Sequence, residues 1–168
     1  MMTSEIGTQY WLDADDKLHR SDDMPAYITV DGIQVWHQHG KCHRNGDLPA
    51  YVNPRDGLQM WSQHGKLHRD GDLPAIMYPN GNKRWYQHGN LHRESDLPAV
   101  INAGELLMWY QHNEKHRDGG LPAYVDTDGL QCWYQHDHCM KRLHVTDCSE
   151  RSFRFMWMSK QWLQNQKW

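Results

Sequence analysis

The sequence predicts an all-β fold, an elongated solenoid in which tandem β-hairpins form a single-layer twisted sheet. Tryptophan recurs every 24 or 25 residues, and a fixed period of this length is typical of stacked repeat units. A proline also recurs in each full unit, where it would break any helix placed across it. The recurring residues are Trp11, Trp36, Trp61, Trp85, Trp109, Trp133 and Trp157, and Pro25, Pro49, Pro74, Pro98 and Pro122.

Within a unit, the order of residues predicts strand, turn and strand. Residues 58–64 form the tryptophan strand, and side-chain alternation places Trp61 on one of its faces. Gly65 and Lys66 then turn the chain, and the proline opens the next strand, where a missing N–H does least harm. The Asp-Thr-Asp-Gly sequence of residues 126–129 predicts a second tight turn between strands.

Two ladders follow from this repetition. We expect each tryptophan to stack over that of the next unit, which makes a structural ladder of Trp36, Trp61, Trp85, Trp109 and Trp133. Each full unit also carries an arginine followed by acids, and such pairs predict an ionic ladder along one edge. The pairs are Arg44 with Asp47, Arg69 with Asp70 and Asp72, and Arg93 with Glu94 and Asp96.

The length of 168 residues suits one domain. We divide it into a degenerate N-terminal cap unit (1–34), repeats (35–131), and a degenerate unit with a C-terminal cap (132–168), since terminal units of repeat arrays are atypical. The mean hydropathy of −0.95 indicates a thin core, to which nine Trp and eight Tyr contribute large areas.

No apolar run approaches the ~20 residues of a membrane span, and no segment near the start resembles a signal peptide. We therefore expect a cytoplasmic protein without membrane contact. The four cysteines in a repeat array do not suggest a disulfide framework, and a reducing compartment agrees with this location.

The C-terminal tail has two interpretations. Alternation of Phe153, Phe155 and Trp157 favours a closing strand, followed by a short helix or turn over 161–166. The alternative is a helix capped by residues 147–150.

Charge divides unevenly along the chain. Residues 1–31 hold seven acids against two bases, so we expect this end to engage a basic surface on a protein partner. At the other end, two tryptophans provide more apolar surface than a cap of this size needs, which predicts a homodimer or partner interface there. The candidate partner-binding residues are Asp13, Asp15, Asp16, Asp22, Asp23, Trp162 and Trp168.

Histidines recur in pairs four residues apart. On a helix such spacing suggests a zinc pair, but glycine inside most of these pairs places them around a turn. We therefore expect the imidazoles to bond neighbouring backbone, with metal loading or a partner-contacting edge as alternatives. The pairs are His39 and His43, His64 and His68, His88 and His92, and His112 and His116.

Cysteine and histidine also gather in the degenerate sixth unit. These are zinc-binding residue types, but their spacing lacks a Cys-x-x-Cys knuckle. Cys132 and Cys139 fall where other units carry Met or Leu, and free cysteine behaves there as a small apolar residue. We therefore expect no metal; the candidate ligands, should one bind, are Cys132, His136, His138, Cys139, His144 and Cys148.

The segment from Trp61 to His68, with its His-Gly-Lys turn and the Tyr and Gly that follow, resembles the MORN repeat. The likeness covers most of the chain. It departs from the family where His-Arg replaces His-Gly and where Leu-Pro-Ala replaces the paired glycines. It is closer to variant repeats of phage, giant-virus and bacterial proteins that carry His-Arg and Pro-Ala. The resemblance implies an elongated single-layer sheet that serves as a binding scaffold, and it implies no chemistry.

The sequence carries no Gly-x-Ser-x-Gly elbow, phosphate loop or dinucleotide fingerprint, so we expect no enzymatic activity and no cofactor. The expected function is protein binding. The resemblance adds a phage or mobile-element inhibitor that sequesters a host defence protein in the host cytoplasm. The alternatives are single-stranded nucleic-acid binding along the tryptophan and arginine ladders, and a self-assembling structural component.

Overall fold

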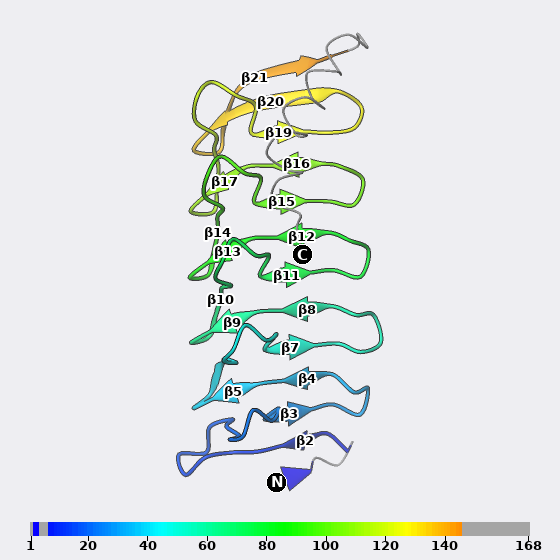
Figure 1. The fold of residues 1–168 in the computed structure, drawn as a ribbon, viewed down its shortest axis with the longest axis vertical. Helices are drawn as coiled ribbons and strands as arrows, with labels where there is room; N and C mark the ends of the chain where they lie inside the picture. The colour runs from blue at the N-terminus through cyan, green and yellow to red at the C-terminus, as the bar shows by residue number, and fades with distance from the viewer. Residues whose placement is uncertain (1, 4–6, 146–168) are drawn as a thin grey trace.

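One antiparallel sheet of 13 strands runs the length of the molecule (Figure 1). The computed structural model describes residues 2–3 and 7–145, and this part contains 21 short strands and no helix. The prediction of an all-β, hairpin-rich single layer is therefore confirmed. No helix of the described residues is long and apolar enough to cross a membrane.

Most units contribute two strands to this sheet, and each strand pairs with the next one along it. In order across the sheet they are β1 (Met2–Thr3), β2 (Gln9–Tyr10), β3 (Tyr27–Ile28), β4 (Gln34–Val35), β7 (Tyr51–Val52), β8 (Gln59–Met60), β11 (Ile76–Met77), β12 (Lys83–Arg84), β15 (Val100–Ile101), β16 (Leu107–Met108), β19 (Tyr124–Val125), β20 (Leu130–Gln135) and β21 (His138–His144).

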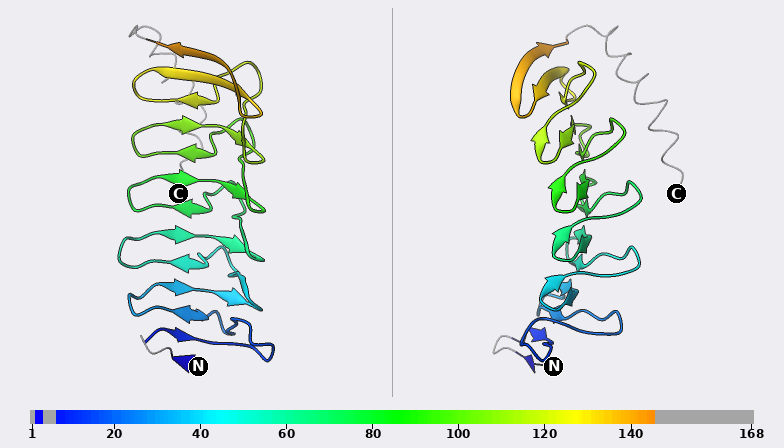
Figure 2. Two further views of the ribbon diagram at one scale, coloured as in Figure 1. Left: turned by 180° about the vertical axis from the view of Figure 1, so that it is seen from behind. Right: turned by 90° about the vertical axis from the view of Figure 1, so that its left-hand side faces the viewer.

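Four units add a small two-stranded hairpin at one side of the main sheet (Figure 2). These hairpins pair β5 (His37–Gln38) with β6 (Lys41–Cys42), β9 (Ser62–Gln63) with β10 (Lys66–Leu67), β13 (Tyr86–Gln87) with β14 (Asn90–Leu91), and β17 (Tyr110–Gln111) with β18 (Glu114–Lys115).

The tryptophan strand expected at residues 58–64 is divided at Trp61. β8 lies in the main sheet, whereas β9 belongs to the small hairpin. Trp61 donates its N–H to the carbonyl of Ala75 at 2.8 Å and accepts from the N–H of His68 at 3.1 Å. The backbone N–H and C=O of Trp61 are therefore both hydrogen-bonded at the point where the chain passes from the main sheet to the small hairpin. The prediction of one continuous strand is wrong.

The tight turn of this hairpin also lies one residue earlier than expected. His64 and Gly65 both adopt the left-handed conformation, with φ of 53° and 83°, and Gln63 pairs directly with Lys66. Two consecutive left-handed residues are typical of a type I′ turn, whose twist matches that of the flanking strands. The first histidine of each pair therefore lies inside the turn, and the predicted turn at Gly65 and Lys66 is wrong by one position.

The second predicted turn is confirmed. Residues 127–129 connect β19 to β20, and the Asp126 carboxylate accepts the N–H groups of Asp128 and Leu130 at 3.0 and 2.9 Å. Such a side-chain cap explains why aspartate begins this turn.

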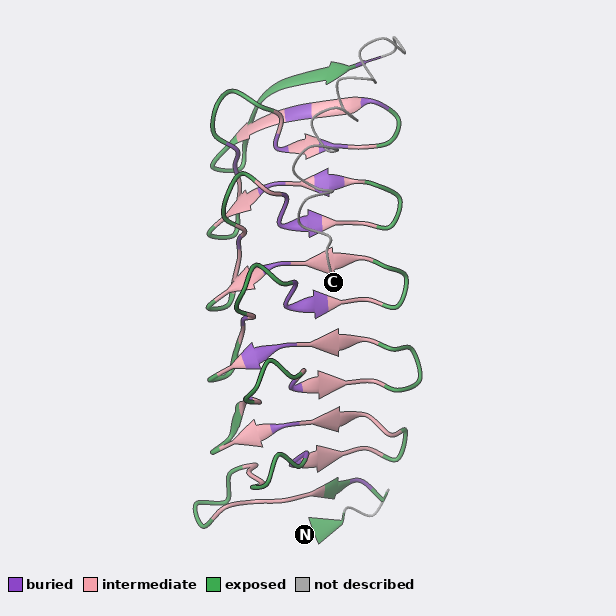
Figure 3. Cartoon of the chain, viewed as in Figure 1, coloured by how far each residue is buried: buried purple, intermediate pink, exposed green. Residues whose placement is uncertain are grey.

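The core is narrow, and in the interior units it contains a column of one tryptophan and one alanine per unit, against which buried sheet residues such as Leu107 and Val125 pack. The alanine that follows each proline has no solvent-exposed surface, so a larger side chain has no room there. The buried members of this column are Trp36, Trp61, Trp85 and Trp109 with Ala26, Ala50, Ala75, Ala99 and Ala123. Elsewhere exposed residues gather in the loops at the two edges of the sheet (Figure 3).

The sixth unit differs from those before it. β20 and β21 form one longer hairpin whose register shifts between Trp133 and Tyr134, and every residue of β21 is exposed. Trp157, Trp162, Trp168 and the alternatives of closing strand and helix lie outside the described residues.

Candidate protein-binding surface

Each tryptophan of units one to five is covered by an arginine of its own unit. In the third unit the guanidinium carbon of Arg69 lies 3.9 Å from the centre of the Trp61 ring. The same contact spans 3.7 to 3.9 Å in the others, between Arg20 and Trp11, Arg44 and Trp36, Arg93 and Trp85, and Arg117 and Trp109. The expected ladder of indole on indole is therefore wrong, because a planar guanidinium occupies the face that the next ring would need.

The same arginine pairs with an aspartate of the preceding unit. Arg69 donates from Nε and Nη2 to the two carboxylate oxygens of Asp47 at 2.7 and 3.0 Å. Equivalent bidentate pairs join Arg44 to Asp23, Arg93 to Asp72 and Arg117 to Asp96. An ionic ladder exists as predicted, but it runs between units and not between an arginine and the acids that follow it.

The indole nitrogen completes this junction between units. Trp61 Nε1 donates to the carbonyl of Asp47 at 3.1 Å, so one aspartate receives both the indole of the next unit and its guanidinium. Arg69 also donates from Nη1 to the carbonyl of Pro74. The side chain of Arg69 is only 13% exposed, whereas that of Asp47 is 51% exposed. In each ion pair, the carboxylate is therefore the more solvent-exposed group.

The histidines form a second column of contacts between units. The Nδ1 atom of His68 accepts the backbone N–H of His88 at 3.2 Å, and the two rings stack with centroids 4.3 Å apart. His19, His43 and His92 make the same acceptor bond to the N–H groups of His39, His64 and His112. The prediction that imidazoles bond neighbouring backbone is therefore confirmed for His43, His68 and His92, whereas the buried Nδ1 of His116 has no hydrogen-bond partner among the described residues.

This bond determines where each imidazole carries its proton. Because Nδ1 of His68 accepts an N–H, the neutral ring holds its hydrogen on Nε2, which lies 3.1 Å from Asp70 Oδ1. His92 faces Glu94 and His116 faces Asp118 in the same way. Hydrogen bonds from Gln63 and then His68 lower the pKa of Asp70 below its ordinary value.

Outside these columns, one apolar side chain per unit faces solvent. This side chain comes directly before the proline of its unit. It also comes directly after the aspartate that pairs with the next unit, except at Leu121, which follows Gly120. Leu48 is 43% exposed and Leu73 is 38% exposed, although leucine in a packed fold is usually buried. We call this set the apolar row: Met24, Leu48, Leu73 and Leu121, which are exposed, with Leu97, which is half-buried.

Carboxylates surround the apolar row. Those of the ion pairs present their outer faces beside it, and Asp70, Glu94 and Asp118 are among the most exposed side chains of their loops. Shallow grooves open between successive units on this side. The groove of about 410 Å³ between units one and two is lined by Asp22, Asp23 and Gly46 among others. Its counterpart near Asp96 and Asp118 measures about 370 Å³.

The five acids predicted to bind a partner differ in their surroundings. Asp15, Asp16 and Asp22 are exposed. Asp23 pairs with Arg44, whose hydrogen bond holds the pKa of this carboxyl below its ordinary value. Asp13 is held by the backbone and by a histidine, as described below. Three of the five therefore remain available to a partner, whereas two stabilise the fold.

The predicted cysteine and histidine cluster does not assemble. Within the described residues, no three ligand atoms from Cys132, His136, His138, Cys139 and His144 approach one another within 4.8 Å. Cys132 is buried and Cys139 is exposed, because they lie on different strands of a hairpin whose register is shifted by a bulge. Cys148 lies outside the described residues.

Sequence inspection missed which aspartate each arginine contacts. The signal was present: an aspartate recurs two residues before the proline of most units, 21 or 22 residues ahead of the arginine that it binds. The next acid in sequence is only one or three residues after each of these arginines, and only the stacking of units shows that the arginine pairs with the more distant aspartate instead. Compared with known proteins, the chain matches no family model, no curated protein and no solved structure.

Proposed function

We propose that this protein is a non-enzymatic scaffold that binds another protein along the apolar row. The observation that carries the proposal is the row itself, with its repeated exposure of leucine at one position of successive units. Exposed apolar groups aligned on an ordered surface usually mark a contact with a partner. The resemblance to the MORN repeat, a class of binding scaffolds, supports the same function.

The spacing of the row suits an elongated partner. Two strands of the main sheet separate one leucine from the next, which corresponds to about 9.5 Å. An α-helix advances about 10.5 Å in seven residues, so a helix with one apolar side chain per heptad meets successive members of the row. The surrounding carboxylates favour lysine and arginine beside those apolar residues. We therefore propose a basic amphipathic helix as the part of the partner that binds.

The exposed acids of the first unit extend this surface. Asp15, Asp16 and Asp22 attract a basic partner from a distance and raise its rate of association. In a phage or mobile-element setting, which the variant MORN-like repeats suggest, the partner is a host defence protein that the scaffold sequesters.

The test uses a tagged protein incubated with the lysate of its native cells, with and without nuclease, and mass spectrometry of the captured proteins. The captured partner is then titrated against a row variant, Leu48→Ser with Leu73→Ser. We expect affinity to fall about tenfold for each leucine. The matched control is Val30→Ser with Met140→Ser, which removes two exposed apolar side chains outside the row.

Equal affinities of the row variant and the control would disprove the row as the binding surface. Capture that disappears with nuclease would disprove protein binding itself. Replacement of Asp15, Asp16 and Asp22 by asparagine is expected to slow association and flatten its dependence on salt, while dissociation remains unchanged.

No observation favours the nucleic-acid alternative. The indole faces that it needs are covered by guanidinium groups, and those guanidinium groups already hold carboxylates. Bases would have to displace the guanidinium groups from the indole rings, and phosphates would have to displace the carboxylates from the guanidinium groups.

A further inference from the structure

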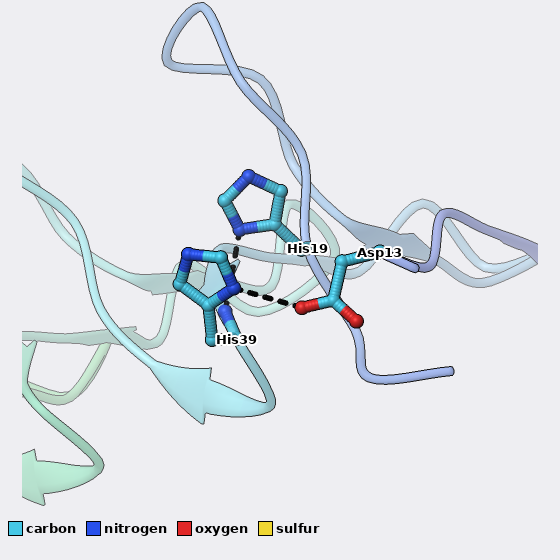
Figure 4. A group of neighbouring side chains, drawn as sticks. All are labelled: Asp13, His19 and His39. Carbon is cyan, nitrogen blue, oxygen red and sulfur yellow. Dashed lines mark hydrogen bonds and ion pairs between the residues drawn. The ribbon is translucent and has the colours of Figure 1, made fainter. Parts of the chain in front are cut away.

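The N-terminal histidine pair lies beside a carboxylate that approaches both of its imidazoles. His19 and His39 stack with ring centroids 4.3 Å apart, and Oδ2 of Asp13 lies 2.8 Å from Nδ1 of His39 (Figure 4). One ligand atom from each of these three side chains lies within 4.8 Å of the other two. Within residues 2–3 and 7–145, this is the one group of three or more His, Cys, Asp or Glu side chains that meets this closely. At the other end of the array, Oε2 of Glu114 also lies 2.6 Å from Nδ1 of His136, but no three ligand atoms of the described residues lie within 4.8 Å of one another there.

The carboxylate is oriented before any ligand arrives. Oδ1 of Asp13 accepts the backbone N–H groups of Asp15 and Lys17, both at 3.0 Å, which leaves Oδ2 facing His39. Hydrogen-bonded carboxylates of this kind are typical of metal sites, because the second bond fixes the ligating oxygen.

The site is also accessible. The side chain of Asp13 is only 12% exposed, whereas that of His39 is 72% exposed, so an ion reaches the three ligands from one side and keeps water on that side. The ammonium group of Lys17, whose backbone N–H donates to Asp13, pairs with Asp15 at 3.4 Å. Residues 1–31 together carry seven acids against two bases, and this charge attracts cations to the N-terminal unit.

We propose that Asp13, His19 and His39 bind a divalent transition-metal ion, for which zinc is the best match. Two imidazole nitrogens and one carboxylate oxygen are ligands that Zn²⁺ prefers, and three protein ligands leave a position for water. Calcium and magnesium favour sites made of oxygen alone. His39 belongs to the second unit and the other two ligands to the first, so the ion joins the cap unit to the rest of the molecule.

The interior units contain a natural control for this site. His43 and His64 stack with centroids 4.6 Å apart, as do His68 and His88 at 4.3 Å. The residue two positions after each tryptophan is Asp13 in the first unit but glutamine in the later ones. Gln63 donates its amide to Asp70 at 3.0 Å, and this aspartate contacts Nε2 of His68 at 3.1 Å. Its carboxylate and the two imidazoles of that pair do not bring three ligand atoms within 4.8 Å of one another.

Metal binding has a small structural cost. The N–H of His39 donates to Nδ1 of His19 at 3.3 Å, and an ion on this nitrogen removes the acceptor. Because the turn is exposed, a water molecule accepts the N–H of His39 in place of the imidazole. The gain is a coordination link between units at the end of the array, where terminal units open most readily.

The experiment titrates the metal-free full chain with zinc chloride at neutral pH in a calorimeter, beside the variants Asp13→Asn, His39→Asn and His64→Asn. Asparagine at position 13 keeps an oxygen for the two backbone N–H groups, and at positions 39 and 64 it tolerates the left-handed φ of 47° and 53°. We expect one equivalent of zinc in the unaltered chain, at least a tenfold loss of affinity in D13N and H39N, and no change in H64N.

A second measurement reports the ligands directly. Cobalt(II) in place of zinc is expected to show strong visible absorption in the unaltered chain and in H64N, but not in D13N. Thermal melting of each variant without metal establishes that it is folded, and zinc is expected to raise the melting temperature only where it binds.

Three results would overturn the proposal: no binding at millimolar zinc, unchanged affinity in D13N, or equal losses in H39N and H64N. A site lost only on Cys139→Ser would place the metal in the β20–β21 hairpin instead.

Discussion

At the scale of single residues, the arginine that covers each tryptophan makes three kinds of contact at once. Arg69 stacks on Trp61, forms a bidentate pair with Asp47 of the preceding unit and donates to the carbonyl of Pro74. A planar fork with several donors and a flat face is needed for this combination, and lysine has neither. The thin core is therefore covered by an arginine whose hydrogen-bond acceptors come from its own unit and from the preceding unit.

We expect Arg69→Ala to lower the free energy of unfolding by about 2–4 kcal/mol, because it removes a charge-assisted pair and a desolvated cation–π contact. Arg69→Lys is expected to cost less, since it keeps the charge. Urea denaturation measures both. The control is Arg55→Ala, which breaks another pair between units, with Asp31, but from a side chain that is 65% exposed; we expect a change of about 0–1 kcal/mol. Equal losses at positions 55 and 69 would refute the role given to stacking and burial.

At the scale of elements, the small hairpin is the point at which each unit meets the next. Its turn residues, His64 and Gly65 in the third unit, lie against the unit before them. The N–H of His64 donates to the imidazole of His43, and the N–H of Gly65 donates to the carbonyl of Cys42. The turn of this hairpin is therefore held against the preceding unit by two backbone N–H groups.

The hairpin strand β5 makes stability depend on pH. Burial lowers the pKa of His37 below its ordinary value of 6.5, so the unfolded chain takes up this proton first as the pH falls. Stability is therefore complete above about pH 6.5 and decreases below it. The equivalent position is Ser62 in the third unit and tyrosine in the fourth and fifth, at Tyr86 and Tyr110. We therefore expect His37→Tyr to reduce this loss.

Urea titrations at a series of pH values measure the effect. A second decrease is expected below about pH 4, because lowered pKa values make Asp70 and Asp118 contribute stability only while they are ionised. A free energy of unfolding that stays constant from neutral pH to about pH 5.5 would contradict the effect assigned to His37.

At the scale of the whole molecule, every described junction between the interior units uses the same register. Met60 pairs with Ile76 between β8 and β11, and Arg84 pairs with Val100 between β12 and β15. A unit therefore contacts only its neighbours, and stability is the sum of units and junctions.

We expect deletion of residues 61–84 to leave a folded protein. Met60 then precedes Trp85, β8 takes the place of β12 beside β15, and Asp47 meets Arg93 in place of Arg69. The urea m-value is expected to fall with the buried area of one unit, while circular dichroism keeps its β character. The control removes residues 61–72, half a unit, which leaves tryptophan and proline out of phase; a folded product from that deletion would contradict the stacking model.

The all-β hairpin fold and the turn at residues 126–129 could be predicted from the sequence because both depend on local preferences. Proline excludes a helix wherever it recurs, and Asp-Thr-Asp-Gly forms a tight turn through its own side chains. The backbone role of the histidines was predictable for the same reason: glycine within a pair indicates a turn. The prediction of one continuous strand failed at Trp61, because side-chain alternation does not reveal that the chain passes there from the main sheet to the small hairpin.

The sequence by itself determined the period, the strand and turn content and the side chains that recur in each unit. Only the tertiary structure decided which of these meet: Arg69 with Asp47 in place of Asp70, indole with guanidinium in place of indole, and Asp13 with His19 and His39. The physical reason is that stacking places residues 20 to 26 positions apart within hydrogen-bond distance. Adjacent residues on a strand, by contrast, point to opposite faces.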